Sequence, residues 1–172
     1  IGFSKDEKGG TFIVANFFPT GNVANQYSFN VFPPKGDLNQ IRKKKRQEFS
    51  KFALEALEAH NRYRTKHHSP PLTLNKELCK IAQDYSEKLL QNNAVKYSFG
   101  KFKGNDMGEN IFMCQGSEAT GEMATNDWYN EIKNHNFKKD FQKDTGHFTQ
   151  IIWKDTKEVG FGVANRGNTY YV

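Results

Sequence analysis

The spacing of apolar side chains between residues 49 and 133 predicts three helices. Residues 49–66 carry one apolar stripe at helical spacing, made of Phe49, Phe52, Ala53, Ala56, His60 and Tyr63 with Leu57 at its edge. Residues 76–92 carry a second stripe after the candidate N-cap Asn75, made of Leu78, Ile81, Ala82, Tyr85 and Leu89. A third helix is expected from Ser117 or Thr120 to Lys133, and it would bury Met123, Ala124, Trp128 and Ile132.

The C-terminal part of the chain has a different pattern. Residues 93–108 and 134–146 are polar and predict loops, and Phe148–Trp153 is a short apolar segment. Residues 159–172 alternate in the manner of a strand, a Gly-containing turn and a second strand, which is the signal of a β-hairpin. Helices followed by strands favour an α+β fold over an alternating α/β fold.

The two ends of the chain repeat each other. Residues 1–14 (IGFSKDEKGGTFIV) align without a gap on residues 159–172 (VGFGVANRGNTYYV), with Gly2, Phe3, Gly9, Thr11 and Val14 identical to their counterparts. A repeat of this kind indicates a tandem protein. We therefore expect three regions.

Residues 1–35 would be the C-terminal hairpin and tail of a preceding unit, or the permuted last strand of this one. Residues 36–47 would be a basic linker, and residues 48–172 a domain without its last strand. In the permuted arrangement residues 11–18 would fill the slot of that strand, which would otherwise leave an exposed sheet edge.

Composition narrows the classes of protein. A length of 172 residues suits one domain, and the chain has no apolar run of about 18 residues, which excludes a transmembrane helix within it. Two cysteines, Cys79 and Cys114, exclude a disulfide scaffold, and their pairing is left open. The formal net charge of +6 favours anionic partners.

Five adjacent basic residues concentrate that charge: Arg42, Lys43, Lys44, Lys45 and Arg46. Such a run is either a solvated segment or a contact for an anionic membrane or a nucleic acid. The absence of interleaved aromatic residues disfavours nucleic acid as the partner.

Three residues form the candidate chemistry: Glu109, Glu131 and His147. Two carboxylates and an imidazole could bind Zn²⁺ or act as a general acid and base. Each also has a purely structural alternative, as a cap, a solvated helix residue or a loop anchor. His60 is expected to be a hydrogen-bonded core histidine, and His67 and His68 are expected to be exposed in a loop.

Several motifs in a fixed order resemble the CAP superfamily of cysteine-rich secretory, antigen 5 and pathogenesis-related proteins. They are His60-Asn61-x-Tyr63-Arg64, Pro71-Leu72-x-Leu74, Ala82-Gln83-x-Tyr85-Ser86-Glu87, Gly108-Glu109-Asn110, Trp128-Tyr129-x-Glu131 and residues 146–153 (GHFTQIIW). The resemblance covers residues 48–172, and Phe12–Pro34 resembles the C-terminal end of the same family. It implies an α-β-α sandwich in which a small antiparallel sheet lies between helices.

The resemblance also implies a cleft lined by two His and two Glu. Glu109, Glu131 and His147 match three of these residues, but Tyr97 stands where the family has its other His. Tyr is a poor Zn²⁺ ligand because its phenol keeps its proton up to about pH 10. Three protein ligands suffice for an open Zn²⁺ site, with a lower affinity than a two-His site would have, and a purely hydrogen-bonded cleft is the alternative.

With its low cysteine count, the chain resembles the Golgi-associated branch of this superfamily, whose members are cysteine-poor and associate with the cytosolic side of membranes. We therefore expect a non-catalytic module that associates with anionic membrane surfaces, lipids or protein partners, including itself, as part of a tandem protein. The alternative function is a Zn²⁺-dependent hydrolase that uses the Glu/Glu/His cleft. The expected location is the cytosolic face of the Golgi or other endomembranes or the cytoplasm, with secretion as the alternative.

Overall fold

The computed structural model describes residues 11–31, 49–116, 118–166 and 169–171. The helices are α1 (Tyr27–Asn30), α2 (Lys51–Lys66), α3 (Lys76–Asn92), α4 (Gly121–Asn130), the 3-10 turn η1 (Glu131–Asn134) and α5 (Gly146–Ile152). The strands are β1 (Thr11–Phe18), β2 (Thr73–Leu74), β3 (Lys101–Phe102), β4 (Asn105–Asp106), β5 (Gly108–Cys114), β6 (Glu158–Arg166) and β7 (Thr169–Tyr171).

The three predicted helices are confirmed, and side chains cap each of them. Ser50 accepts a hydrogen bond from the Ala53 N–H at the start of α2. Asn75 caps α3 as expected, and Thr120 caps α4. Such caps satisfy backbone N–H groups that have no partner within the helix. The third helix ends as the η1 turn, and the apolar segment after residue 146 forms the short helix α5.

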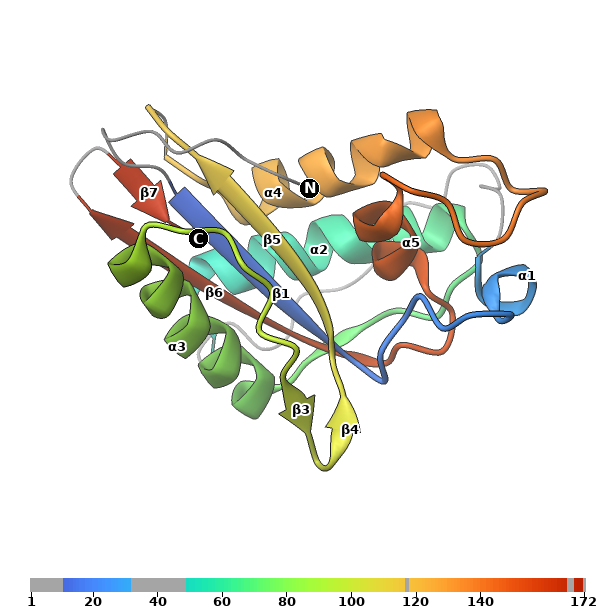
Figure 1. Ribbon diagram of the computed structural model, residues 1–172, viewed down its shortest axis with the longest axis horizontal. Coiled ribbons are helices and arrows are strands. Elements are labelled where there is room, and N and C mark those ends of the chain that lie inside the picture. The colour runs from blue at the N-terminus through green and yellow to red at the C-terminus, as the bar shows by residue number, and fades with distance from the viewer. Residues whose placement is uncertain (1–10, 32–48, 117, 167–168, 172) are drawn as a thin grey trace.

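The main sheet has β5 on one side and β6 with β2 on the other. Strand β1 lies between β5 and β6 and is antiparallel to both, with Val14 opposite Ile111 of β5 and Gly162 of β6 (Figure 1). The short β7 enters the same slot, because Tyr171 pairs with Ala164 and Met113. Strand β2 pairs in parallel with β6, so the sheet is mixed.

Residues 11–18 thus occupy the central slot of the sheet. The division of the chain into residues 1–35, 36–47 and 48–172 stays a prediction, since residues 1–10 and 32–48 lie outside the described residues.

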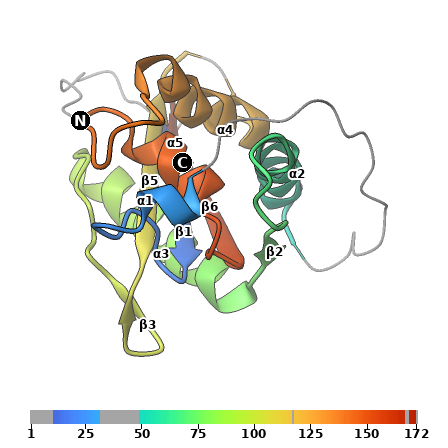
Figure 2. The same ribbon diagram turned by 90° about the vertical axis from the view of Figure 1, so that its right-hand side faces the viewer.

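Helices cover both faces of the sheet, which confirms the α+β class and the α-β-α layering. Figure 2 shows α3 on one side of the strands and α2 with α4 on the other. Strand β6 approaches the backbone of α3 so closely that a Cβ on Gly162 would lie 2.2 Å from the Gln83 nitrogen. Within the described residues, no helix is long and apolar enough to cross a membrane.

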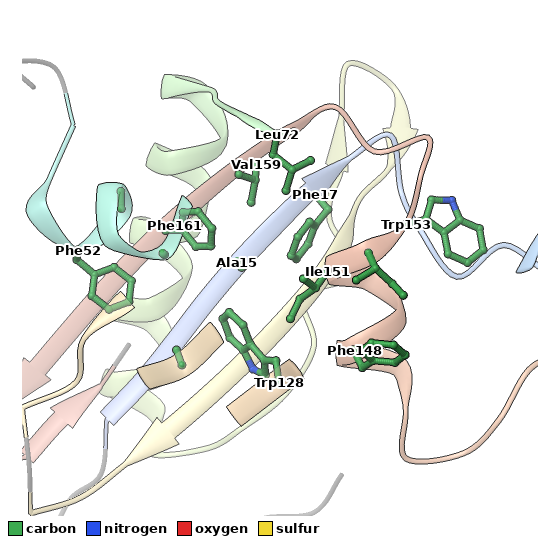
Figure 3. Packing of buried hydrophobic residues seen from close by; sticks show 14 of the residues in the cluster. Ala15, Phe17, Phe52, Leu72, Trp128, Phe148, Ile151, Trp153, Val159 and Phe161 are labelled. Carbon is green, nitrogen blue, oxygen red and sulfur yellow. The ribbon is translucent and has the colours of Figure 1, made fainter. Parts of the chain in front are cut away.

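The larger core lies between the sheet and the α2, α4 and α5 layer. Phe17 of β1, Phe161 of β6 and Trp128 of α4 point into it (Figure 3). His60 lies among these three rings, with its Nδ1 2.8 Å from the Ala56 carbonyl oxygen. Its complete burial lowers the pKa of the imidazole to about 3. His60 is therefore the core histidine that the sequence indicated.

Two sequence-based expectations about burial are wrong. Met123 of α4 is exposed rather than buried. His67 is fully buried rather than exposed in a loop. Its Nε2 lies 2.9 Å from the Tyr129 hydroxyl, and its ring packs edge-on against Tyr129 and Phe148. The reason is tertiary, because aromatic residues of α4 and α5 cover the end of α2.

Arg64 anchors the other side of that helix end. Its guanidinium is fully buried and donates hydrogen bonds to the carbonyl oxygens of Pro70, Ile151, Trp153 and Thr156, at 2.7 to 2.9 Å. One side chain thus joins α2 to the loop before β2, to the end of α5 and to the turn before β6.

Candidate functional site

Glu131 and His147 form the rigid half of the candidate site. One carboxylate oxygen of Glu131 lies 2.8 Å from the His147 Nδ1, and the other accepts the backbone N–H groups of His147 and Phe148 at 2.9 and 3.1 Å. Glu131 directly follows α4 as the first residue of η1, and His147 is the second residue of α5, so this contact joins the two helices. Because a carboxylate only accepts, a neutral His147 carries its hydrogen on Nδ1 and leaves its Nε2 as an acceptor.

Tyr97 occupies that acceptor. Its hydroxyl oxygen lies 2.9 Å from the His147 Nε2, so the tautomer set by Glu131 makes Tyr97 the donor. Burial raises the pKa of Tyr97, and the negative charges of Glu109 and Glu131 raise it further. The phenol therefore stays protonated at neutral pH, and Tyr97, His147 and Glu131 form one continuous chain of hydrogen bonds.

Glu109 has its own set of donors. It accepts hydrogen bonds from the Ser98 backbone N–H at 2.7 Å, from the Ser98 hydroxyl, and from the Asn16 side-chain amide at 3.4 Å. Burial raises the pKa of this carboxyl, and the bonds from Ser98 and Asn16 counteract part of the rise. Glu109 is thus connected to Tyr97 through the neighbouring residue Ser98 rather than through His147.

The four sequence-predicted cleft residues are therefore satisfied by hydrogen bonds. Both ring nitrogens of His147 have partners, one in Glu131 and the other in Tyr97. Over the part of the chain that the structure describes, no three His, Cys, Asp or Glu side chains are grouped to hold a metal ion. Zn²⁺ ligation by Glu109, Glu131 and His147 stays a prediction that this geometry does not favour.

A small polar cavity adjoins the Glu131–His147 pair. It has a volume of about 270 Å³ and is lined by Ile111, Phe112, Asp127, Asn130, Glu131, Lys133, Asn134 and His147. Burial raises the pKa of Asp127, the His147 imidazole lowers it when it is protonated, and the Glu131 carboxylate raises it. Through this cavity, molecules of about the size of water can reach one side of the Glu131–His147 pair.

Sequence reasoning missed several residues that hold the site together. Asn110 donates to the His147 carbonyl oxygen at 3.1 Å, and its place beside Glu109 in the Gly-Glu-Asn motif was an available signal. Asn16 lies 93 positions before Glu109, so nothing in the local sequence connects the two. Their contact follows from the pairing of β1 with β5.

Two other sequence-based candidates have different outcomes. The basic run Arg42–Arg46 falls outside the described residues. Neither Cys79 nor Cys114 forms a disulfide in the part of the chain that the structure describes.

Comparison with known proteins identifies the class to which this fold and site belong. Residues 57–172 match the model of the CAP family, described as the cysteine-rich secretory protein family. The chain belongs to this family, as its motifs suggested.

Individual relatives refine the picture. The chain is 44% identical over 115 residues to the human Golgi-associated plant pathogenesis-related protein 1. The aligned region covers 66% of this chain and 73% of that protein. It is 32% identical over 121 residues to the Saccharomyces cerevisiae protein PRY2, covering 69% of this chain and 34% of that protein. The secreted protein RBT4 of Candida albicans is 29% identical over 113 residues, covering 64% of this chain and 29% of its own length. Golgi-associated and secreted proteins are thus both among its relatives.

The hydrogen bond from Tyr97 predicts how the site responds to Zn²⁺. We expect Tyr97→His to raise Zn²⁺ affinity at least tenfold over the wild type, because a neutral imidazole is an ordinary Zn²⁺ ligand and a protonated phenol is not. Isothermal titration at pH 7 measures both affinities.

Two further variants control this experiment. Tyr97→Phe removes the hydroxyl without adding a ligand, and adding His147→Ala to Tyr97→His should abolish the gain. Micromolar Zn²⁺ binding by the wild type, no weaker than that of Tyr97→His, would contradict the expectation.

Proposed function

We propose that this protein is a non-catalytic CAP-family module that associates with anionic membrane surfaces through its basic segment Arg42–Arg46. The observation that supports a binding role over a catalytic one is the state of His147, whose two ring nitrogens are engaged by Glu131 and Tyr97. A Zn²⁺ ligand needs one of these nitrogens free. No contact among the described residues favours the alternative of a Zn²⁺-dependent hydrolase.

Charge and exposed aromatic residues support a membrane surface as the partner. The chain carries a net charge of +6, and each basic residue close to an anionic surface contributes about 1 kcal/mol. Phe99 and Phe141 are 83% and 74% exposed, and aromatic side chains of this kind insert at the boundary between headgroups and acyl chains. The Golgi-associated name of the human relative supports endomembranes as the location, and the secreted fungal relative keeps secretion as the alternative.

Vesicle sedimentation tests the proposal. The wild type should bind vesicles of phosphatidylserine and phosphatidylcholine and not vesicles of phosphatidylcholine alone. Replacing all five residues from Arg42 to Arg46 with Gln should weaken binding at least a hundredfold, since about 1 kcal/mol is lost per charge. Raising the salt from 0.1 to 0.5 M should also release the wild type, because it screens the attraction.

A matched variant separates the segment from net charge. It replaces five exposed lysines elsewhere with Gln: Lys80, Lys88, Lys138, Lys139 and Lys143. We expect it to retain most of the binding although it loses the same charge. Equal losses in the two variants would overturn the role of the segment, and a wild type that ignores anionic vesicles would overturn the proposal.

A further inference from the structure

The central position of β1 makes the sheet depend on a segment that is joined to the rest of the domain by a long connection. Residues 11–31 form β1 and α1, and residues 32–48 separate them from the described part that begins at residue 49. We propose that the slot between β5 and β6 is a strand-acceptor site, which a second copy of this chain can fill with its residues 11–31 by reciprocal exchange, in competition with the chain's own segment.

The contacts of β1 are those of a strand built into the sheet. It pairs with β5 over Thr11–Phe17 and with β6 over Phe12–Phe18. Val14, Ala15, Asn16 and Phe17 are fully buried. Removing the segment would expose these side chains and leave the facing edges of β5 and β6 without most of their hydrogen-bond partners, so the slot needs an occupant.

The residues after β1 hold the segment in a specific position. The Gly21 N–H donates to the Gln150 side chain at 2.9 Å, and a Cβ on Gly21 would lie 2.6 Å from the same atom. The Lys157 N–H donates to the Phe18 carbonyl oxygen, and the Lys154 N–H donates to the Asn30 carbonyl oxygen. All these partners lie in the body of the domain, so a copy of the segment from another chain could make the same contacts.

The covalent connection is long enough for either arrangement. Arg64, in the last turn of α2, donates to the Trp153 carbonyl oxygen, and Tyr27 of α1 packs against the Trp153 ring at 5.0 Å between centroids. These contacts place α1 near the end of α2. The connection from α1 to the start of α2 must therefore cover about 24 Å, the length of α2 (Figure 1). Residues 32–48 can span about 58 Å when extended, which permits a return within one chain or a crossing to a second.

A second strand, β7, also enters the slot between β5 and β6. Strand β7 is antiparallel to β6, as β1 is, and Tyr171 pairs with the two residues that flank Phe12, Ala164 and Met113. Residues 159–172 repeat the sequence of residues 1–14. The slot thus accepts strands of this sequence irrespective of how they are connected to the domain. This is the condition for exchanging a strand between identical chains.

Shortening the connection tests the proposal by oligomeric state. Deleting residues 34–47 leaves three residues that span at most about 14 Å, too short to fill the slot within one chain. Light scattering should then show about twice the monomer mass. A control with a Gly/Ser linker of the same 14-residue length in their place should stay monomeric at the same concentration. A folded, monomeric deletion variant would overturn the proposal.

A disulfide test uses the full-length chain. Thr11 is opposite Cys114 in the β1–β5 register, and Cys79 is replaced by Ala throughout. One chain carries Thr11→Cys with Cys114→Ser, and a second, mass-tagged chain keeps Thr11 and Cys114. Refolding the two together at high concentration should give at least ten times more mixed disulfide than refolding them separately and then mixing.

A single chain with both Thr11→Cys and Cys114 is the positive control, because its cysteines meet when the slot is filled from the same chain. Equal yields from the joint and separate refolding, with the control disulfide closed, would overturn the exchange. Because this outcome concerns pairing of strands and not lipid, it leaves the membrane proposal untouched.

Discussion

Arg64→Met should lower the free energy of unfolding by about 4 kcal/mol, because four backbone carbonyls lose a hydrogen bond and each buried acceptor without a partner costs about 1–3 kcal/mol. The Trp153 carbonyl keeps a second donor, the Thr156 N–H. The removal of a buried charge offsets part of this sum. For a chain of this length, the loss corresponds to a fall in Tm of about 10 °C. Urea denaturation monitored by circular dichroism measures it.

Arg62 provides the matched control on the same helix. It pairs with Glu122 at 2.8 Å on the surface, so Arg62→Met should cost less than about 1 kcal/mol. Arg64→Lys should retain little of the stability, since one ammonium cannot reach four carbonyls that a planar guanidinium bridges. An Arg64→Met variant within 1 kcal/mol of the wild type would contradict the anchoring role.

Gly162→Ala should be the second most damaging change, with a loss of about 3 kcal/mol from forced overpacking. The new Cβ would lie 2.2 Å from the Gln83 nitrogen and 2.4 Å from the Ala82 carbonyl carbon, both backbone atoms of α3. Backbone atoms of a helix cannot rotate away, so α3 would have to leave the sheet. That displacement would also strain the pair of hydrogen bonds, 2.9 Å each, between the Gln83 side chain and the backbone of Val163.

Gly146→Ala is the control for the loss of a glycine as such. The nearest atom to its new Cβ is the Asn22 side-chain nitrogen at 4.0 Å, and the residue begins α5. We expect no loss, or a gain of up to about 1 kcal/mol from the better helix propensity of Ala. Urea midpoints for the two variants compare them directly, and similar midpoints would show that close packing at Gly162 is unimportant.

The sequence was most informative where local patterns determine structure. The helices α2, α3 and α4 follow from apolar spacing, and the candidate cap Asn75 is confirmed at the start of α3. The motifs alone point to Glu109, Glu131, His147 and the unusual Tyr97 as residues of the candidate cleft. They did not reveal that Tyr97 completes a hydrogen-bond chain, because a spacing pattern carries no information on donor and acceptor geometry.

The features that sequence reasoning missed all depend on contacts between distant segments. His67 is buried by Tyr129 and Phe148, which belong to other helices. The side chains of α5 from His147 to Ile152 are buried on every side, so this helix shows no apolar stripe to detect. Arginine is usually a surface residue. No local pattern indicates that four backbone carbonyls converge on Arg64, because the fold alone brings them together.

The position of β1 also bears on how the chain can be made. Residues 11–18 are synthesised before either neighbour, yet their partners lie at 108–114 and 158–166. At about 5–20 residues per second, the ribosome needs roughly 10–30 s to proceed from the first strand to the last. During that time the strand has no place in a sheet, and its apolar side chains are open to chaperones or to neighbouring nascent chains. Such distant pairing also predicts slow folding after release.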